Sequence, residues 1–479
     1  MAQTGAVDAR RRALIVARFG AGGVVIAGAL ALALVLLSIT DQANTSAAGY
    51  LPLAWSATAV LVVVAVVALF IRRVDIRLTR GFAWLVGGVS FVASFLPWWG
   101  LAGGNPDLGT LIYRGLKVPQ GIIQFWDLSL VMKSVDCARF GFDIYADNNG
   151  CMQDASIYAP GMVWVQYVPF SIFSESNAGV LGVGMIIISS LVLAWLARQS
   201  QGLGQIALLI AALGGPWLLL LERGNIDAVV LWSAAVVVLA VRRKDSLWVW
   251  ALGAALLWLM GTWKYYPFVM GAMLLPVLRL RHGWTVLAGY AVAAFGFVIV
   301  TWENFRFSSG SNTAMIDYGD FVVLGRVPVV ARMLGTDVGA GGWQAGDLLL
   351  LVLVILAAVW GWGVGASLKR VRTWMSMLAI SGSLLYLASV LVAGFGYGYK
   401  ATFLLLTIPL LSQLVSSQRR MIAASGVAVL LLVGIESVVV WNTVMVTIAG
   451  LVISGFATGL SAVHLLRSVR LPITAWDRP

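Results

Sequence analysis

Charged side chains are scarce in this sequence. Asp, Glu, Lys and Arg together make up 11% of its 479 residues, whereas hydrophobic residues make up 60%. A chain with so few charges cannot present a water-facing surface over most of its length, and it has to be solvated by lipid or by itself. This excludes an ordinary soluble protein, and we expect a protein of the lipid bilayer.

Histidine and cysteine are rare as well. The sequence has two of each, and Cys137 and Cys151 share one polar segment that contains neither His282 nor His464. Cysteines without a neighbouring histidine make a poor zinc site, so we expect no metal. On an oxidising side of the membrane, this spacing favours a disulfide that would contribute roughly 3 kcal/mol to local order. Two free thiols are the alternative.

Long apolar runs recur along the whole chain. Runs of about 17 to 20 residues match the roughly 30 Å hydrocarbon core of a bilayer, whereas barrel strands would alternate in shorter segments. We expect an all-α polytopic membrane protein of about fourteen transmembrane helices. No half of the sequence repeats the other, so residues 1–479 are expected to form one domain. The expected spans are 20–38, 54–71, 82–98, 178–197, 205–221, 227–241, 246–262, 266–280, 284–301, 346–364, 375–393, 401–416, 421–438 and 443–466.

The basic residues predict how these spans are oriented. The first span follows a basic stretch and is too long for a cleaved signal peptide, so we expect a retained anchor with a cytoplasmic N-terminus. The inside then has 22 basic and 4 acidic residues, a net +18, and the outside has 10 basic and 16 acidic residues, a net −6, which together give the formal +12. This positive-inside pattern predicts a bacterial inner-membrane protein with both termini cytoplasmic, and it explains the basic pI without nucleic acid.

Two long polar segments, 99–157 and 302–345, fall on the outer side in this arrangement. We expect the functional site there. Between them, the apolar segment 158–173 is shorter than a span and contains two prolines. It either enters and leaves on the same side or crosses the membrane, and a crossing would invert everything downstream.

An aspartate heads a helical pattern in the first outer segment. After Asp127, the residues Leu128, Val131 and Val135 recur on one helical face, which predicts a helix with this face packed and Asp127 directed into a cavity. Further polar motifs lie in the same outer segment, at the point where the chain re-enters the membrane, and at the expected outer ends of three later helix pairs. They are G-x-D-x-Y at Gly141–Tyr145, Y-x-P at Tyr158–Pro160, R-G-N-x-D at Arg223–Asp227, K-x-Y-P at Lys264–Pro267 and the run Gly398–Lys400.

Together, the order and sidedness of these motifs resemble the GT-C superfamily of lipid-linked-sugar glycosyltransferases. The motifs at Arg223–Asp227 and Lys264–Pro267 are similar to glycosyltransferase family 87, which includes polyprenol-phosphate-mannose mannosyltransferases. The resemblance implies a GT-C-like bundle that transfers a sugar, mannose or arabinose, from a polyprenyl-phosphate donor to a glycolipid or polysaccharide acceptor. Transfer would be inverting, would occur at the outer face and would need no cofactor.

The resemblance also implies roles for individual residues. A general base must take the proton of the acceptor hydroxyl, and Asp127 is the carboxylate expected to do so. Cationic side chains would stabilise the phosphate that leaves. The residues expected to bind the donor phosphate or substrate are Arg223, Lys264, Lys400, Tyr158, Asn225, Asp143 and Arg306.

Several alternatives remain at this point. Lys264 and Lys400 could be ordinary interface anchors, and Arg223 could pair with Glu222 or Asp227. A transporter or flippase of lipid-linked glycans would place ionisable residues near the middle of its spans, where almost none occur here. A surface-polysaccharide polymerase or ligase would share the outer-face site.

The expected orientation is testable. In the variant Asn105→Cys, the introduced thiol should react with a membrane-impermeant reagent in intact cells or spheroplasts, because the positive-inside pattern places this segment outside. Failure to label would overturn the topology.

Overall fold

The computed structural model describes residues 80–102, 125–145, 150–152, 158–167, 172–304, 345–368, 371–391, 398–414 and 440–470. Over these ranges the regular structure is helical and contains no strand, which confirms the all-α class. The expected spans 20–38, 54–71 and 421–438 lie outside the described residues, as does Arg306.

The helices follow the expected order along the chain. They are α3 (Arg80–Ala102), α5 (Trp126–Arg139), η2 (Pro160–Tyr167), η3 (Glu175–Asn177), α6 (Ala178–Gln199), α7 (Leu203–Ala212), α8 (Gly215–Glu222), α9 (Asp227–Arg243), α10 (Leu247–Trp263), η4 (Tyr266–Arg279), α11 (Gly283–Val300), α14 (Ala345–Ser367), α15 (Thr373–Leu391), η6 (Gly398–Thr407), α16 (Ile408–Leu411) and α18 (Val440–Arg470). The elements named η are 3-10 helices.

Length and composition single out fewer membrane crossings than the sequence predicts. Among the described residues, four helices are long and apolar enough to cross a bilayer: Gly81–Leu101, Glu175–Gln199, Gly283–Val300 and Ala449–Val469. The bent pair α7–α8, with 48° between its halves, would make a fifth. The apolar helix α10, with 17 residues, spans only about 26 Å of a core of roughly 30 Å. A helical membrane protein is thus supported, and fourteen crossings stay a prediction.

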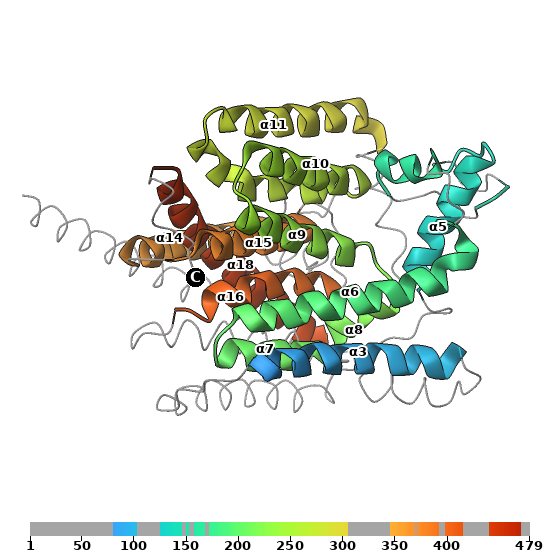
Figure 1. Cartoon of the computed structure of the whole chain (residues 1–479), viewed down its shortest axis with the longest axis horizontal. Helices are drawn as coiled ribbons and strands as arrows, with labels where there is room; N and C mark the ends of the chain where they lie inside the picture. Colours follow the sequence, from blue (N-terminus) through green and yellow to red (C-terminus); the bar gives the residue numbers. More distant parts are fainter. Residues whose placement is uncertain are drawn as a thin grey trace, which may run out of the picture.

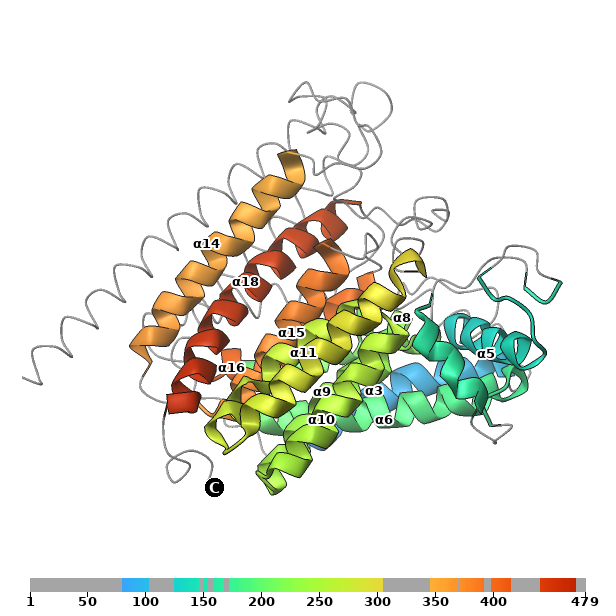
Figure 2. The same ribbon diagram turned by 90° about the horizontal axis from the view of Figure 1, so that it is seen from above.

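Most helices run side by side, with α5 at one end of the bundle (Figures 1 and 2). Helix α15 packs against α18, η4, η6 and α9, and its side chains from Thr373 to Ser389 are almost all buried. It therefore forms the centre of the bundle. The short helix η2, in the segment 158–173, packs against α5 and α10. Its eight residues rise only about 16 Å, so η2 alone does not cross a bilayer.

Glycines set the closest helix contact. Gly361 and Gly365 lie four apart on α14, and Gly455 and Gly459 lie four apart on α18. A Cβ atom on Gly361 or Gly459 would come within 1.9 Å of a backbone oxygen of the other helix. This small-x-x-x-small arrangement lets two helix backbones touch, which is how helices associate where no water drives them together.

Helix α5 forms where the sequence predicts it. Leu128, Val131 and Val135 are 5% exposed or less, so the expected apolar face packs into the protein. The C-terminal end of α5 is held by a disulfide between Cys137 and Cys151, whose Cα atoms are 5.8 Å apart. The expected cysteine pair is thus confirmed.

The α14–α18 contact predicts a sharp contrast between two glycines. Gly459→Ala should lower the free energy of unfolding by about 1 to 3 kcal/mol, because the added methyl has to push the two backbones apart. Gly296→Ala on α11 has nothing within 4 Å of the new Cβ, so it should change stability by less than about 1 kcal/mol or raise it. Thermal unfolding of both purified variants in one detergent measures the difference. Equal melting temperatures would contradict the close contact.

Candidate functional site

The start of α5 is docked onto the turn between α8 and α9 by backbone hydrogen bonds. The amide of Phe125 donates to the carbonyl of Glu222 at 2.8 Å, and the amide of Asp127 donates to the carbonyl of Arg223 at 3.1 Å. Gly224 has a φ of +60°, and a Cβ there would lie 2.9 Å from the Cβ of Leu128. Glycine is therefore required by both its backbone conformation and the close approach. These contacts place Asp127 beside the R-G-N-x-D motif.

The carboxylate of Asp127 receives two donors from that motif. Arg223 donates from Nη1 to Oδ1 at 3.2 Å, and Asn225 donates from Nδ2 to Oδ2 at 2.5 Å. The two charged side chains are 13% and 14% exposed, so the pair lies at the edge of the site. Burial disfavours the charged guanidinium, but the charge and hydrogen bond of Asp127 outweigh it and raise the pKa of Arg223. A carboxylate has about four lone pairs, so Asp127 keeps acceptor capacity.

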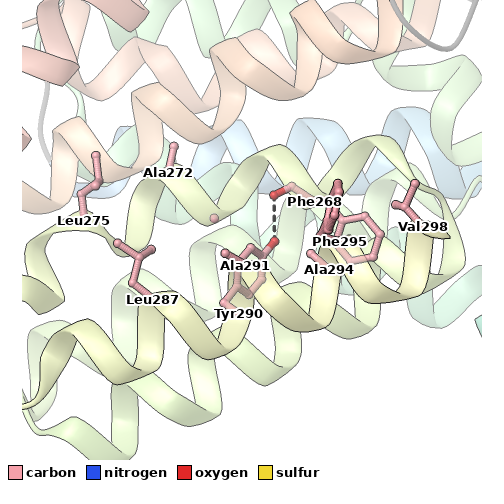
Figure 3. A pocket seen from close by; sticks show the side chains of 10 residues that line it. Phe268, Ala272, Leu275, Leu287, Tyr290, Ala291, Ala294, Phe295 and Val298 are labelled. Carbon is pink, nitrogen blue, oxygen red and sulfur yellow. Dashed lines mark hydrogen bonds between the residues drawn. The ribbon is translucent and has the colours of Figure 1, made fainter. Parts of the chain in front are cut away.

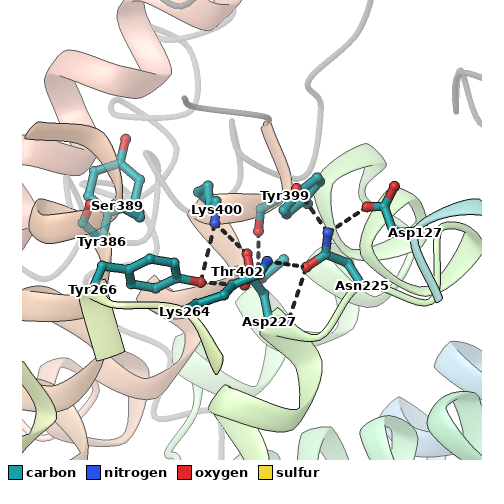
Figure 4. A network of polar contacts seen from close by, with 10 residues as sticks. All are labelled: Asp127, Asn225, Asp227, Lys264, Tyr266, Tyr386, Ser389, Tyr399, Lys400 and Thr402. Atoms are coloured by element: carbon teal, nitrogen blue, oxygen red, sulfur yellow. Dashed lines mark hydrogen bonds and ion pairs between the residues drawn. The ribbon is translucent and has the colours of Figure 1, made fainter. Parts of the chain in front are cut away.

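Asn225 connects this pair to a second cluster (Figure 4). Its Nδ2 also donates to the hydroxyl of Tyr399 at 3.0 Å. Its Oδ1 accepts from Nζ of Lys264 at 2.9 Å and from the backbone amide of Asp227 at 3.0 Å. Asn225 is 2% exposed. Hydrogen bonds to both Nδ2 and Oδ1 fix the orientation of its side-chain amide.

Asp227 lies at the centre of the second cluster and is fully buried. Its Oδ1 accepts from Nζ of Lys264 at 2.6 Å and from the hydroxyl of Tyr266, and its Oδ2 accepts from Nζ of Lys400 at 2.6 Å. Lys400 also donates to the hydroxyl of Tyr266 at 3.2 Å. Asp227 is the first residue of α9, where the helix dipole favours a negative charge.

The segment after the first polar loop closes one side of the cluster. The ammonium of Lys264 lies 5.5 Å from the ring centre of Tyr158. The next residue, Ala159, donates its amide to the carbonyl of Trp263 at 3.1 Å. A Cβ on Gly161 would lie 2.3 Å from the hydroxyl oxygen of Thr262, so only glycine permits this approach. The Y-x-P and K-x-Y-P motifs are therefore in direct contact.

The structure brings together most of the residues that the sequence singled out. Asp127, Arg223, Asn225, Lys264, Lys400 and Tyr158 form one continuous network. Asp143 does not join these contacts; its Oδ1 accepts from the amide of Tyr145 at 3.0 Å in the turn after α5. Neither lysine is a simple interface anchor, because their side chains are only 13% and 7% exposed.

Three members of the network were not selected from the sequence as site residues. Asp227, Tyr266 and Tyr399 occur within the quoted motifs but were given no role. A signal for Asp227 was present: two lysines expected to share one low-dielectric site need a carboxylate beside them. The sequence also left open a pair between Arg223 and Asp227, whereas Arg223 pairs with Asp127 and both oxygens of Asp227 are taken by lysines.

Helix η4, which begins with Tyr266 of this network, also borders an apolar groove. The groove lies between η4 and α11, has a volume of about 710 Å³ and is lined by side chains such as Phe268, Ala272, Leu275, Leu287, Ala294 and Val298 (Figure 3). The hydroxyl of Tyr290 in its wall donates to the carbonyl of Phe268 at 2.8 Å and is satisfied. The groove is thus suited to hydrocarbon.

Comparison with known proteins gives no neighbour for this site. No family model, no curated protein and no solved structure matches the chain. Among the described residues, no three His, Cys, Asp or Glu side chains gather in a way that could hold a metal ion. What the site does has to be argued from its own geometry.

Removal of the central carboxylate should be costly. Asp227→Ala leaves two buried ammonium groups without their counter-ion, and the free energy of unfolding should fall by about 3 to 5 kcal/mol. The matched control is Asp136→Ala. It removes a carboxylate, 27% exposed, that pairs with Arg139 and accepts from the backbone amide of Glu175 at 2.9 Å. That change should cost about 1 to 2 kcal/mol. Thermal unfolding compares the two, and similar losses would show that the buried cluster is not held by its charges.

Proposed function

We propose that this protein is a membrane glycosyltransferase that moves a sugar from a polyprenyl-phosphate donor to an acceptor hydroxyl of a glycolipid or polysaccharide. The observation that carries the proposal is one network in which a carboxylate with spare acceptor capacity is linked, through Asn225, to a pair of buried lysines. Such an arrangement offers a base for the acceptor hydroxyl and cations for the leaving phosphate, and the two are linked by a short chain of hydrogen bonds.

Asp127 is the proposed general base. As the acceptor oxygen attacks the anomeric carbon, its proton passes to the carboxylate. Arg223 and Asn225 each hold one oxygen of Asp127, and α5 is fixed to the α8–α9 turn by backbone bonds. These contacts orient the carboxylate before the acceptor arrives, and preorganisation of this kind is the main means by which a site lowers a barrier.

Lys264 and Lys400 are the proposed partners of the donor phosphate. When the bond between the anomeric carbon and the phosphate oxygen breaks, the electron pair stays on that oxygen and the lipid phosphate gains one negative charge. Ammonium groups held beside it stabilise that charge most where water is largely excluded. The side-chain exposures of 13% and 7% meet that condition.

The apolar groove supports a lipid-linked donor. Helix η4 begins with Tyr266 in the polar network and continues to Phe268 and Leu275 in the groove. Along α11 the lining runs from Leu287 to Val298, which is roughly 16 Å, about half of a 30 Å hydrocarbon core. A lipid with its phosphate at the lysines could place its chain along this groove within one leaflet.

The position of the charges favours this proposal over a transporter. Asp227 begins α9, Lys264 directly follows α10 and Lys400 lies near the start of η6, so the charged groups are at helix ends. A transport pathway would need them at mid-span. A polymerase or ligase that transfers a whole glycan would use the same base and remains the second candidate.

The test is a transfer assay with a panel of polyprenyl-phosphate sugars. Asp127→Asn should lower turnover by about 10² to 10⁴, because the amide keeps the shape of the side chain but cannot take a proton. Donor affinity should change little, whereas Lys264→Ala should mainly weaken donor binding.

The matched control is Asp143→Asn, which alters a carboxylate of the same loop outside the network and should retain turnover. Expression level and melting temperature are matched across variants. If Asp127→Asn turns over like the wild type, the base is misassigned. If the wild type consumes no lipid-linked sugar, the transporter hypothesis gains.

A further inference from the structure

Lys264, Lys400 and Asp227 form a triad of charged side chains, and its net charge follows from the charge of each member. Lys264 and Lys400 each contribute one positive charge and the carboxylate between them contributes one negative charge, which leaves the triad at +1. Next to the triad, the single positive charge of Arg223 interacts with two carboxylates, Asp127 and Glu222, so Arg223 offers no further positive charge to a ligand. Thus the triad has room for one negative charge, and no further positive charge of this cluster is unpaired among the described residues.

The number of N–H groups still available on the two lysines also indicates what ligand the triad can bind. An ammonium has three N–H groups. Lys264 donates to Asp227 and Asn225, and Lys400 donates to Asp227 and Tyr266. In the part of the chain that the structure describes, one N–H of each lysine is left for a ligand. Each ammonium also lies within 5.5 Å of a tyrosine ring centre, which attracts a cation without neutralising it.

One negative charge shared by two acceptor oxygens is the description of a phosphodiester. A lipid phosphate monoester differs, since it has a third free oxygen and close to two negative charges at neutral pH. Bound at a +1 triad whose side chains are 0% to 13% exposed, a diester is neutralised, whereas a monoester keeps a net charge of about −1. The lysines still attract the second charge of the monoester, but they hold the monoester less tightly than the diester.

We infer that Asp227 determines specificity by cancelling one of the two lysine charges, so that the site prefers a singly charged lipid phosphodiester over a doubly charged monoester. This inference rests on the proposed function, in which the sugar donor is a phosphodiester and the spent lipid is a monoester. The same charge balance that admits the donor then promotes release of the product. Without Asp227 the triad would hold the product more tightly.

The experiment measures binding rather than transfer. The wild-type protein is placed in nanodiscs of uncharged phosphatidylcholine and titrated with two probes of one chain length, a polyprenyl phosphate and its methyl phosphodiester. Neither probe carries a sugar, so a failure of the proposed glycosyl transfer does not affect the readout. Dimethyl phosphate in solution is the third probe, and it shows whether a free phosphodiester binds as well as a lipid one.

The wild type should bind the methyl diester more tightly than the monoester. In Asp227→Asn the preference should move toward the monoester by about tenfold or more, because the lost charge lies 2.6 Å from each of the two ammonium groups that would hold the phosphate. The double variant Asp227→Asn/Lys400→Gln returns the triad to +1 and should return the preference toward the diester. Tyr266→Phe removes a hydrogen-bond partner of Asp227 without changing charge, and the ratio of the two affinities should not move.

A purely structural role of Asp227 would not produce this pattern. Unchanged selectivity in Asp227→Asn, or a double variant that keeps the selectivity of the single one, would overturn the inference. If Asp227→Asn does not fold, Lys400→Gln decides: it takes the triad to zero and should weaken binding of the diester by about tenfold or more. Wild-type diester affinity in folded Lys400→Gln would also overturn it. Tighter binding of dimethyl phosphate than of the lipid diester would exclude a lipid ligand.

Discussion

A fully buried carboxylate between two lysines is the interaction on which the site depends. Asp227, Lys264 and Lys400 come from the start of α9, the end of α10 and the start of η6. None of the three charges is stable alone in a low-dielectric interior, since the loss of one partner leaves an uncompensated charge. The three helix ends therefore have to meet at one point, and the tyrosines and Asn225 around them complete the hydrogen bonds.

The rest of the bundle is held by a different kind of contact. Helices α14 and α18 meet through glycines whose neighbours are backbone atoms of the opposite helix. Contacts of this kind need no charge and little side-chain volume, so the interiors of the helices can remain apolar. The charged residues of the site lie at helix ends, where the network from Asp127 to Lys400 gathers (Figure 4).

Helix η4 joins the polar and apolar parts of the site. It begins with Tyr266, whose hydroxyl contacts Asp227, and its later residues form one wall of the groove against α11. A ligand with an anionic head and a long apolar chain would use both. This is the physical reason to favour a lipid-linked substrate over a small soluble one, and it is independent of the resemblance to the GT-C superfamily.

Features that depend on neighbouring residues could be predicted from the amino-acid sequence. The scarcity of charge predicted a helical membrane protein, the spacing of Leu128, Val131 and Val135 predicted α5, and the two cysteines of one loop predicted their bond. Helix periodicity and loop closure are local, so they can be read from spacing. The expected number of crossings stays a prediction, because the described residues contain four helices that meet the length and composition of a span, or five with the bent pair, and three of the expected spans lie outside these residues.

Which polar side chains meet could not be predicted in this way, because it depends on the packing of the helices. Asn225 contacts Asp127 across 98 positions of the chain, and Lys400 contacts Asp227 across 173. The motifs predicted a shared site, but not that Arg223 holds Asp127, that Asp143 remains apart, or that Asp227 is the centre. Which ions pair depends on where distant backbones lie, and that is set by packing of the whole bundle, which no local spacing records.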